Sequence, residues 1–151
     1  MHRYRGTLAT SGLLAALACG GGDAEPAARA AVTDSGLIAT LSTDRPASAP
    51  GEPVTLTLTI RNATSAPLTL EFASAQRYDF TIADADTREV WTWSTGQQFA
   101  QMLGEETIGA GDSVVYRERF AGRLAAGRYR AWGMVARIGD LITASAEFEV
   151  R

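Results

Sequence analysis

Residues Val54 to Ile60 read VTLTLTI, so every second side chain in this run is apolar and those between are threonine. Successive side chains of a β-strand point to opposite faces, and this alternation is typical of a strand with one buried and one wet face. A shift of the pairing by one residue would turn all the apolar side chains of the run into water. The run therefore predicts a strand of firm register in a sheet that covers a core.

Further stretches carry strand-like patterns, and turn-forming residues separate them. These expected strands span residues 37–41, 68–72, 78–83, 89–94, 113–120, 128–138 and 143–150. Residues 95–111 form an irregular connection, where the helix-like spacing of Phe99, Met102 and Leu103 allows a single helical turn. A chain of about 7–8 short strands predicts an all-β fold, an antiparallel β-sandwich of immunoglobulin-like type.

Residues 124–129, LAAGRY, resemble the Leu-x-x-Gly-x-Tyr corner that is common in immunoglobulin-like domains. The resemblance implies that the hydroxyl of Tyr129 bonds back to nearby backbone. A body of about 115 residues buries about two-thirds of the surface of its unfolded chain, which is enough without disulfides.

Residues 1–19, MHRYRGTLATSGLLAALAC, have an arginine-bearing start and then a short apolar segment. The segment has the length of a signal-peptide core and is shorter than the roughly 20 residues of a membrane-spanning helix. Residues 16–19 resemble the lipobox of bacterial lipoproteins, which implies lipidation of Cys19, although Ala16 replaces the usual leucine. The alternative is an ordinary secretion signal with an incidental cysteine.

Residues 20–35 are rich in alanine, glycine and proline and cannot bury enough apolar surface to order themselves. The sequence thus predicts a signal peptide over residues 1–19, a flexible tether over 20–35 and one domain over 36–151. We expect an exported protein that a lipid on its N-terminus anchors to a membrane.

Catalytic and metal-binding side chains are scarce in this chain. His2 and Cys19 are its only histidine and cysteine, and it has no lysine. The domain therefore lacks the imidazole base of Ser-His-Asp or Cys-His enzymes and the usual ligands of zinc. The whole chain has 14 basic and 17 acidic residues, so it also lacks the basic surface that nucleic-acid binding requires. We expect no enzymatic activity, no cofactor and no nucleic-acid partner.

The carboxylates form no recognisable site either. Hydrolysis by a carboxylate pair needs two acids that face one cleft, whereas Glu105 and Glu106 are adjacent on a loop. Asp84 and Asp86 could supply oxygen ligands to calcium, but the other positions of an EF-hand loop are missing. We interpret the pair as a solvated turn, and Asn62-Ala63-Thr64 as a turn rather than a glycosylation acceptor.

Several aromatic and turn motifs occur along the domain. They are Phe72, Ser74-x-Gln76-x-Tyr78-Asp79-Phe80, Glu89-Val90-Trp91-Thr92-Trp93-Ser94, Phe99-x-Gln101, Gly111-Asp112-Ser113 and Gly127-x-Tyr129. Together these motifs resemble the BsuPI-type intracellular proteinase inhibitor family over residues 56–134. The resemblance implies a non-catalytic domain that binds and restrains a protease. Its signature residues, which we interpret as structural, are Tyr78, Asp79, Phe80, Trp91, Trp93, Ser94 and Tyr129.

The chain departs from the family pattern in two loops and in its leader. Ala75 stands where glycine is expected, and no glycine follows Asp86, which implies a longer hairpin turn. The family is named for intracellular proteins, whereas the leader of this chain predicts export.

Two hypotheses remain open for the signature residues. Trp91 and Trp93 share one face of a strand, and they either belong to the core with Tyr78 and Phe80 or form an exposed patch for a partner or a carbohydrate. Asp79 either faces solvent or accepts hydrogen bonds that hold the following loop.

The connection after Ser94 is the best candidate for protein recognition, because loops on a rigid sandwich are where such domains usually bind. Its candidate contact residues are Gln98, Phe99, Gln101, Met102 and Leu103. The alternative is that Phe99 and Leu103 fold back under the loop as part of the core.

The sequence therefore predicts an exported inhibitor of a serine protease. The alternative function is an envelope adaptor or structural module with no protease target. The expected partner is a protease or another envelope protein, and we expect membrane contact only through the N-terminal lipid.

Overall fold

The computed structural model of this chain describes residues 29–32 and 35–151. Within these ranges the chain forms strands and loops and no helix. The strands are β1 (Arg29–Val32), β2 (Leu37–Thr43), β3 (Ala47–Ser48), β4 (Val54–Asn62), β5 (Leu68–Phe72), β6 (Asp79–Asp84), β7 (Glu89–Thr92), β8 (Gly104–Ile108), β9 (Ser113–Phe120), β10 (Gly127–Arg137) and β11 (Asp140–Val150).

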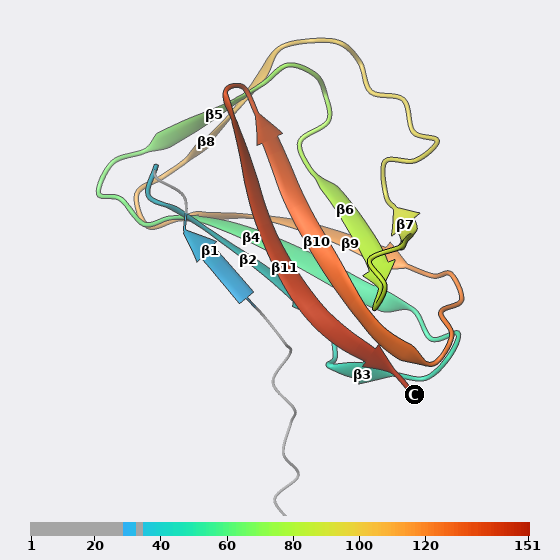
Figure 1. The fold of residues 1–151 in the computed structure, drawn as a ribbon. Helices are drawn as coiled ribbons and strands as arrows, with labels where there is room; N and C mark the ends of the chain where they lie inside the picture. Colours follow the sequence, from blue (N-terminus) through green and yellow to red (C-terminus); the bar gives the residue numbers. More distant parts are fainter. Residues whose placement is uncertain (1–28, 33–34) are drawn as a thin grey trace, which may run out of the picture.

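Two sheets and one separate ribbon make up the fold (Figure 1). The first sheet has the strand order β1-β2-β4-β9, the second has β3-β11-β10-β6-β7, and β5 pairs with β8 alone. All pairs are antiparallel except the short contact of β3 with β11. The predicted all-β sandwich is confirmed, while its immunoglobulin-like type stays a prediction.

The alternation of apolar residues and threonines in residues 54–60 matches the alternation of burial along β4. In β4, Val54, Leu56, Leu58 and Ile60 are buried, and the threonines between them are half-buried. The buried side chains of β4 face the inward side chains of the second sheet, where β10 carries Gly133. A Cβ on Gly133 would lie 3.2 Å from methyl carbons of Leu41 and Leu58, so this glycine lets the two sheets approach.

Three strands, β1, β3 and β8, fall outside the predicted set. β8 lies in the connection where the sequence allowed a helical turn, and it pairs along β5. Residues 99–103, where that turn was expected, form no helix, so the expectation was wrong. β1 lies inside the predicted tether of residues 20–35 and pairs with β2, so at least residues 29–32 belong to a sheet. The predicted signal peptide and Cys19 lie outside the described residues.

Buried polar contacts fasten the ribbon to the first sheet. The side-chain amide of Asn62 donates to the carbonyls of Ala66 and Ile108, at 2.7 and 3.0 Å. Its oxygen accepts from the backbone N–H and the hydroxyl of Thr64. The Asn62-Ala63-Thr64 triplet is thus a structural turn, as predicted, with its asparagine fully buried.

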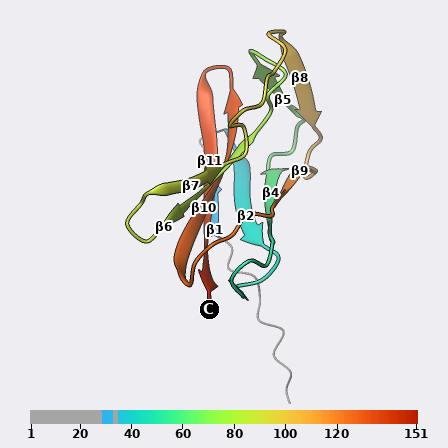
Figure 2. The same ribbon diagram turned by 90° about the vertical axis from the view of Figure 1, so that its right-hand side faces the viewer.

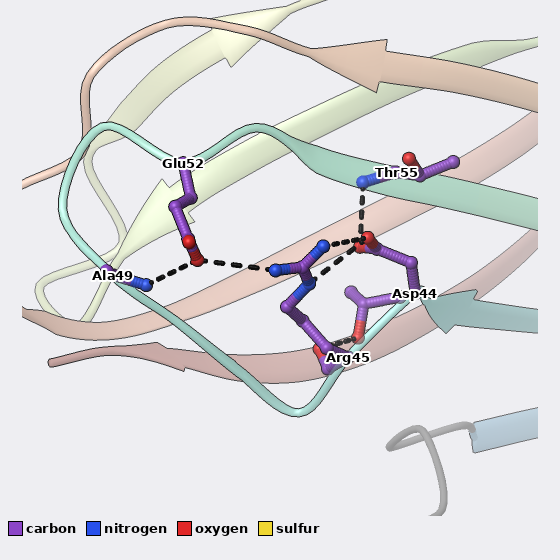
Figure 3. A network of polar contacts seen from close by, with 6 residues as sticks. Asp44, Arg45, Ala49, Glu52 and Thr55 are labelled. Carbon is purple, nitrogen blue, oxygen red and sulfur yellow. Dashed lines mark hydrogen bonds and ion pairs between the residues drawn. The ribbon is translucent and has the colours of Figure 1, made fainter.

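Ion pairs close the connection between β2 and β4 (Figure 3). Arg45 bridges Asp44 and Glu52, while Asp44 accepts the N–H of Thr55 and Glu52 accepts the N–H of Ala49. These exposed pairs shape a turn at the end of the sandwich where the C-terminus lies.

The predicted tyrosine corner is present at the start of β10. The hydroxyl of Tyr129 donates to the carbonyl of Ala125 at 2.9 Å, and its ring stacks on Phe148. None of the described residues belongs to a helix that is long and apolar enough to span a membrane.

Candidate functional site

Tyr78 is the centre of an aromatic cluster that joins the two sheets. Its ring stacks on Trp93 and on Tyr116, both at 4.6 Å between centroids, and meets the edge of Phe80 at 5.6 Å. Tyr116 belongs to β9 of the first sheet, whereas the other rings come from the segment around β6 and β7. Stacked and edge-to-face pairs at these distances stabilise a fold by about 0.5–1.5 kcal/mol each beyond burial.

Both tryptophans of the Trp-x-Trp motif support the core. Trp91 and Trp93 are half-buried and pack against the buried cluster. Trp91 lies 5.2 Å from the ring of Phe120, at a tilt. Each ring therefore packs part of its surface on the core and leaves part of it exposed.

Burial and acidic neighbours hold the tyrosine hydroxyls of the cluster in the protonated form. Tyr78 donates to Glu118 at 2.6 Å, and Tyr116 donates to Glu106 at 2.5 Å. Burial raises the pKa of both tyrosines far above the usual value of about 10, and the hydrogen bond to each glutamate and its charge raise it further.

Asp79 joins the start of β6 to the chain that leaves β7. Its carboxylate accepts the backbone N–H of Ser94 at 3.1 Å and also the Ser94 hydroxyl. It further accepts the N–H of Phe80 at 2.8 Å and a weak bond from Gln76. The hypothesis that this carboxylate holds the following loop is confirmed, and the solvent-facing alternative is wrong, because the side chain is half-buried against Ser94.

The recognition loop, residues 94–103, is fastened along its first half. A turn closes with the bond from the N–H of Gln97 to the carbonyl of Ser94, and the Gln97 side chain donates to the Trp93 carbonyl. Phe99 is half-buried and packs its ring on Trp93 at 5.7 Å. Phe99 thus folds back towards the core, as the alternative hypothesis predicted for it.

The end of the recognition loop lies between two backbone attachments. The carbonyl of Ala100 accepts the N–H of Ala75 at 2.9 Å, and β8 begins at Gly104, which is paired with Phe72. Between these points Gln101 is exposed, and Met102 and Leu103 expose 61% and 77% of their surface. At this exposure Leu103 does not fold back into the core, so the alternative hypothesis is wrong for this residue.

Arg77 supports the same segment from below. Its guanidinium lies 4.5 Å from the ring centroid of Phe72 and donates to the carbonyl of Ser74. A Cβ on Gly104 would lie only 2.1 Å from this guanidinium, so a larger residue there would displace the end of the Arg77 side chain. Gln98, the remaining predicted contact residue, is exposed.

The sequence prediction missed two apolar side chains near the recognition loop. The turn between β10 and β11 donates the N–H of Ile138 to the carbonyl of Glu71 at 2.7 Å, so β5 lies between β8 and this turn (Figure 2). Ile138 and Leu141 are 50% and 53% exposed. An apolar residue at a tight hairpin turn was the available signal. We call Met102, Leu103, Ile138 and Leu141 the apolar tip.

The acidic candidates form no reactive site. Asp84 accepts the N–H groups of Asp86 and Arg88, which makes it the organiser of its own turn, as interpreted from the sequence. Glu106 is engaged by Tyr116, while the neighbouring Glu105 is exposed. In the part of the chain that the structure describes, no group of three or more Asp, Glu, His or Cys side chains could hold a metal ion.

The structure therefore brings most signature residues together. Tyr78, Asp79, Phe80, Trp93 and Ser94 form one unit beneath the recognition loop. Trp91 lies beside this unit on Phe120, and Tyr129 belongs to the corner at the start of β10. The fold and this arrangement define a β-sandwich domain with a supported surface loop.

A family comparison agrees with this description. The family model of the BsuPI intracellular proteinase inhibitor matches residues 41–138, a longer stretch than the motifs alone indicated. The chain belongs to the BsuPI intracellular proteinase inhibitor family. A search of curated proteins finds no match.

Solved structures share parts of the arrangement at low similarity. The C-terminal domain of wzt is 10% identical with a TM-score of 0.48, over 84% of this chain and 78% of that one. A glucanotransferase from Paenibacillus sp. is 22% identical with a TM-score of 0.47; the match spans 73% of this chain but only 13% of that protein. The sporulation control protein Spo0M from Bacillus subtilis is 15% identical with a TM-score of 0.42, over 82% of this chain and 48% of that one.

Proposed function

We propose that this domain inhibits a serine protease by inserting the end of its recognition loop into the substrate cleft of the enzyme. The observation that carries the proposal is the exposure of Met102 and Leu103 between two fixed points of the backbone. A loop that is already ordered loses little conformational entropy on binding, which favours affinity.

Inhibition of this kind needs no chemistry from the inhibitor. Exposed apolar side chains can fill pockets that normally receive substrate side chains, and a few such anchors usually supply most of the binding energy. Ile138 and Leu141 would widen the contact beside the loop. The aromatic cluster and the bond of Asp79 to Ser94 would keep the loop from adapting to the enzyme as a flexible substrate does.

Titration against subtilisin-like proteases tests this function. Loss of activity at a stoichiometric amount of the protein supports it, and cleavage of the domain without inhibition contradicts it. Leu103→Ala is expected to weaken inhibition at least about tenfold, or about 1.4 kcal/mol. Val115→Ala, at an equally apolar exposed position on β9, serves as the matched control and is expected to inhibit normally.

A different result would support the alternative function. The lipoprotein-like leader favours an envelope adaptor, which predicts co-purification with a non-protease partner and no inhibition of any protease tested. Apolar residues at the tip would then hold that partner instead.

We also propose that the protein is exported and anchored through a lipid on Cys19. The support is the leader, residues 1–19, with its apolar segment and lipobox-like end. Metabolic labelling with a radioactive fatty acid tests the anchor. Label that is present in the natural protein and absent from Cys19→Ser supports it, and a soluble, unlabelled protein in the cytoplasm contradicts it.

A further inference from the structure

An open cavity of about 450 Å³ lies across the second sheet, far from the recognition loop. It spans the ends of β11, β10 and β6 that are remote from the β10–β11 turn, and the projecting β6–β7 hairpin borders it (Figure 2). Its volume is within the range of small-molecule sites. Its lining residues include Asp84, Thr87, Arg128, Arg130, Trp132 and Glu147.

The floor of the cavity carries charged side chains of both signs beside an indole ring. Arg128, Arg130 and Trp132 are every second residue of β10, so they share one face of the sheet. Glu147 lies opposite Arg130 and forms an ion pair with it at 2.5 Å. The Arg130 guanidinium also lies 5.9 Å from the centroid of the half-buried Trp132 ring.

The charges of the cavity are largely balanced within the protein. Besides the Arg130–Glu147 pair, Asp84 lies 4.0 Å from Arg88, and Glu149, a further lining residue, lies 3.8 Å from Arg151. Arg128 is the one lining guanidinium for which the described residues provide no ion pair or side-chain hydrogen bond. The cavity thus offers many donors and acceptors around an aromatic ring, with no strong net charge to select an ion.

The wall of the cavity contains the strained residue of the hairpin turn. Thr87 has a φ of 64°, and within residues 29–32 and 35–151 no other residue except glycine has a positive φ. A β-branched residue is a rare occupant of this left-handed region, and strain of this kind clusters at ligand sites. The Thr87 hydroxyl donates to the carbonyl of Asp86 at 2.6 Å and can still accept a hydrogen bond, whereas a glycine would satisfy the turn alone.

We propose that this cavity is a binding site for a neutral mono- or disaccharide. A sugar ring has an apolar face of C–H groups, which the negative face of an indole attracts, and a rim of hydroxyls. Guanidinium and carboxylate groups at fixed spacing can donate to and accept from such hydroxyls. The ligand approaches Trp132 with its apolar face, while Arg128, Glu147 and Thr87 bond its hydroxyls.

The site is independent of protease inhibition. Arg128 lies near the start of β10, at the open end of the β10–β11 hairpin, and Ile138 lies in the turn at the other end, so the two surfaces occupy opposite ends of the same pair of strands. A failure of either proposal leaves the other unaffected.

Nuclear magnetic resonance titration of the protein tests the saccharide site. The indole N–H signal of Trp132 is assigned from its loss in Trp132→Phe. Maltose, cellobiose and N,N′-diacetylchitobiose are added separately, up to about 10 mM, which exceeds a weak Kd of about 1 mM. A saturable shift of the Trp132 signal by at least one of them is the expected result. No saturable shift with any of the three overturns the proposal.

Two variants locate the binding event. Arg128→Met changes an exposed residue with no ion pair to lose, so it is expected to fold normally and to weaken binding about tenfold. Met134→Ala, the next outward position on β10 beyond Trp132, lies outside the cavity and is expected to bind normally. Equal binding by Arg128→Met overturns the proposal, as does a shift with the anion glucuronate but with none of the neutral sugars.

Discussion

Asp79 accepts two hydrogen bonds from Ser94, one from its backbone N–H and one from its hydroxyl, and thereby fixes where the recognition loop begins. The two residues are 15 positions apart and lie on either side of the β6–β7 hairpin. One carboxylate therefore links the base of the hairpin to the loop that follows it.

Replacement of this carboxylate is expected to loosen the loop. Asp79→Ala removes charge-assisted hydrogen bonds, which contribute about 1.5–3 kcal/mol each when formed to a charged group, and partial exposure places the loss near the lower value. Hydrogen exchange should become faster in residues 94–103, and protease inhibition should weaken about tenfold. Asp86→Ala is the control, because its side chain makes no hydrogen bond within the described residues. Unchanged exchange and unchanged inhibition in Asp79→Ala would contradict the role of this bond.

Trp93 and Leu103 are expected to separate support from contact. Trp93 packs on Tyr78 and Phe99, so Trp93→Ala should lower the free energy of unfolding by about 3 kcal/mol, the lower end for a buried tryptophan. Leu103→Ala removes an exposed side chain and should change stability by less than about 0.5 kcal/mol while it weakens inhibition. Denaturant unfolding measures both. A stable Trp93→Ala protein would show that this ring is not a support.

The stability of the domain should fall in alkaline solution. The pKa values of Tyr78 and Tyr116 are raised in the folded state, while the unfolded chain loses the same protons near pH 10. Their contribution is complete below about pH 10 and declines above it, because the unfolded state then binds fewer protons than the folded state. Urea unfolding from about pH 8 to about pH 11 should show this decline. The double variant with phenylalanine at both positions should show much less of it, and equal slopes for the two proteins would refute the assignment.

Replacement of Asn62 should destabilise the fold more than replacement of most other polar residues. Asn62→Ala leaves the carbonyl of Ile108 and the N–H of Thr64 without their buried partner, at a cost of about 2–4 kcal/mol. Thr69→Ala removes an exposed hydroxyl contact within the β5–β8 ribbon, to which Ile108 also belongs, and should change the melting temperature little. A small effect of Asn62→Ala would mean that water replaces the lost bonds.

The strain at Thr87 should be measurable as stability. Thr87→Gly places a residue without a Cβ in the left-handed region and should raise the free energy of unfolding by about 0.5–1 kcal/mol. Ala85→Gly, in the same turn but without a positive φ, should lower it instead. If the Thr87 hydroxyl contacts a saccharide, the stabilised variant binds that sugar less tightly. A loss of stability in Thr87→Gly would show that the turn is not strained.

The strands that the sequence predicted are those with a visible period of two. Residues 104–108, GEETI, have no apolar alternation, because the inner face of β8 carries Gly104 and Glu106 and only one buried apolar residue, Ile108, so their pairing along β5 was not predictable from pattern alone. β3 is two residues long and pairs in parallel with β11, so it carries no pattern at all.

The candidate site was predictable in its residues more than in its geometry. The sequence indicated both that Met102 and Leu103 could contact a partner and that Phe99 could fold back, but the choice depended on contacts with Ala75 and Trp93. Trp132 was overlooked because it lies outside the family motifs, although its spacing with Arg128 and Arg130 placed all three on one face.

The pairing of β4 with β9 has a consequence for how the domain folds. Val54 lies opposite Phe120, so the chain between them, with the β5–β8 ribbon, the β6–β7 hairpin and the recognition loop, is enclosed in one large loop. Closing such a loop costs chain entropy before its contacts form. Sheets of this kind therefore fold slowly, in the range of about milliseconds to seconds. The β10–β11 hairpin, whose strands are neighbours in sequence, can form early. We expect stopped-flow refolding to show that inhibitory activity returns only in the final phase, when the enclosing sheet closes around the loop; activity that returned earlier would contradict this order.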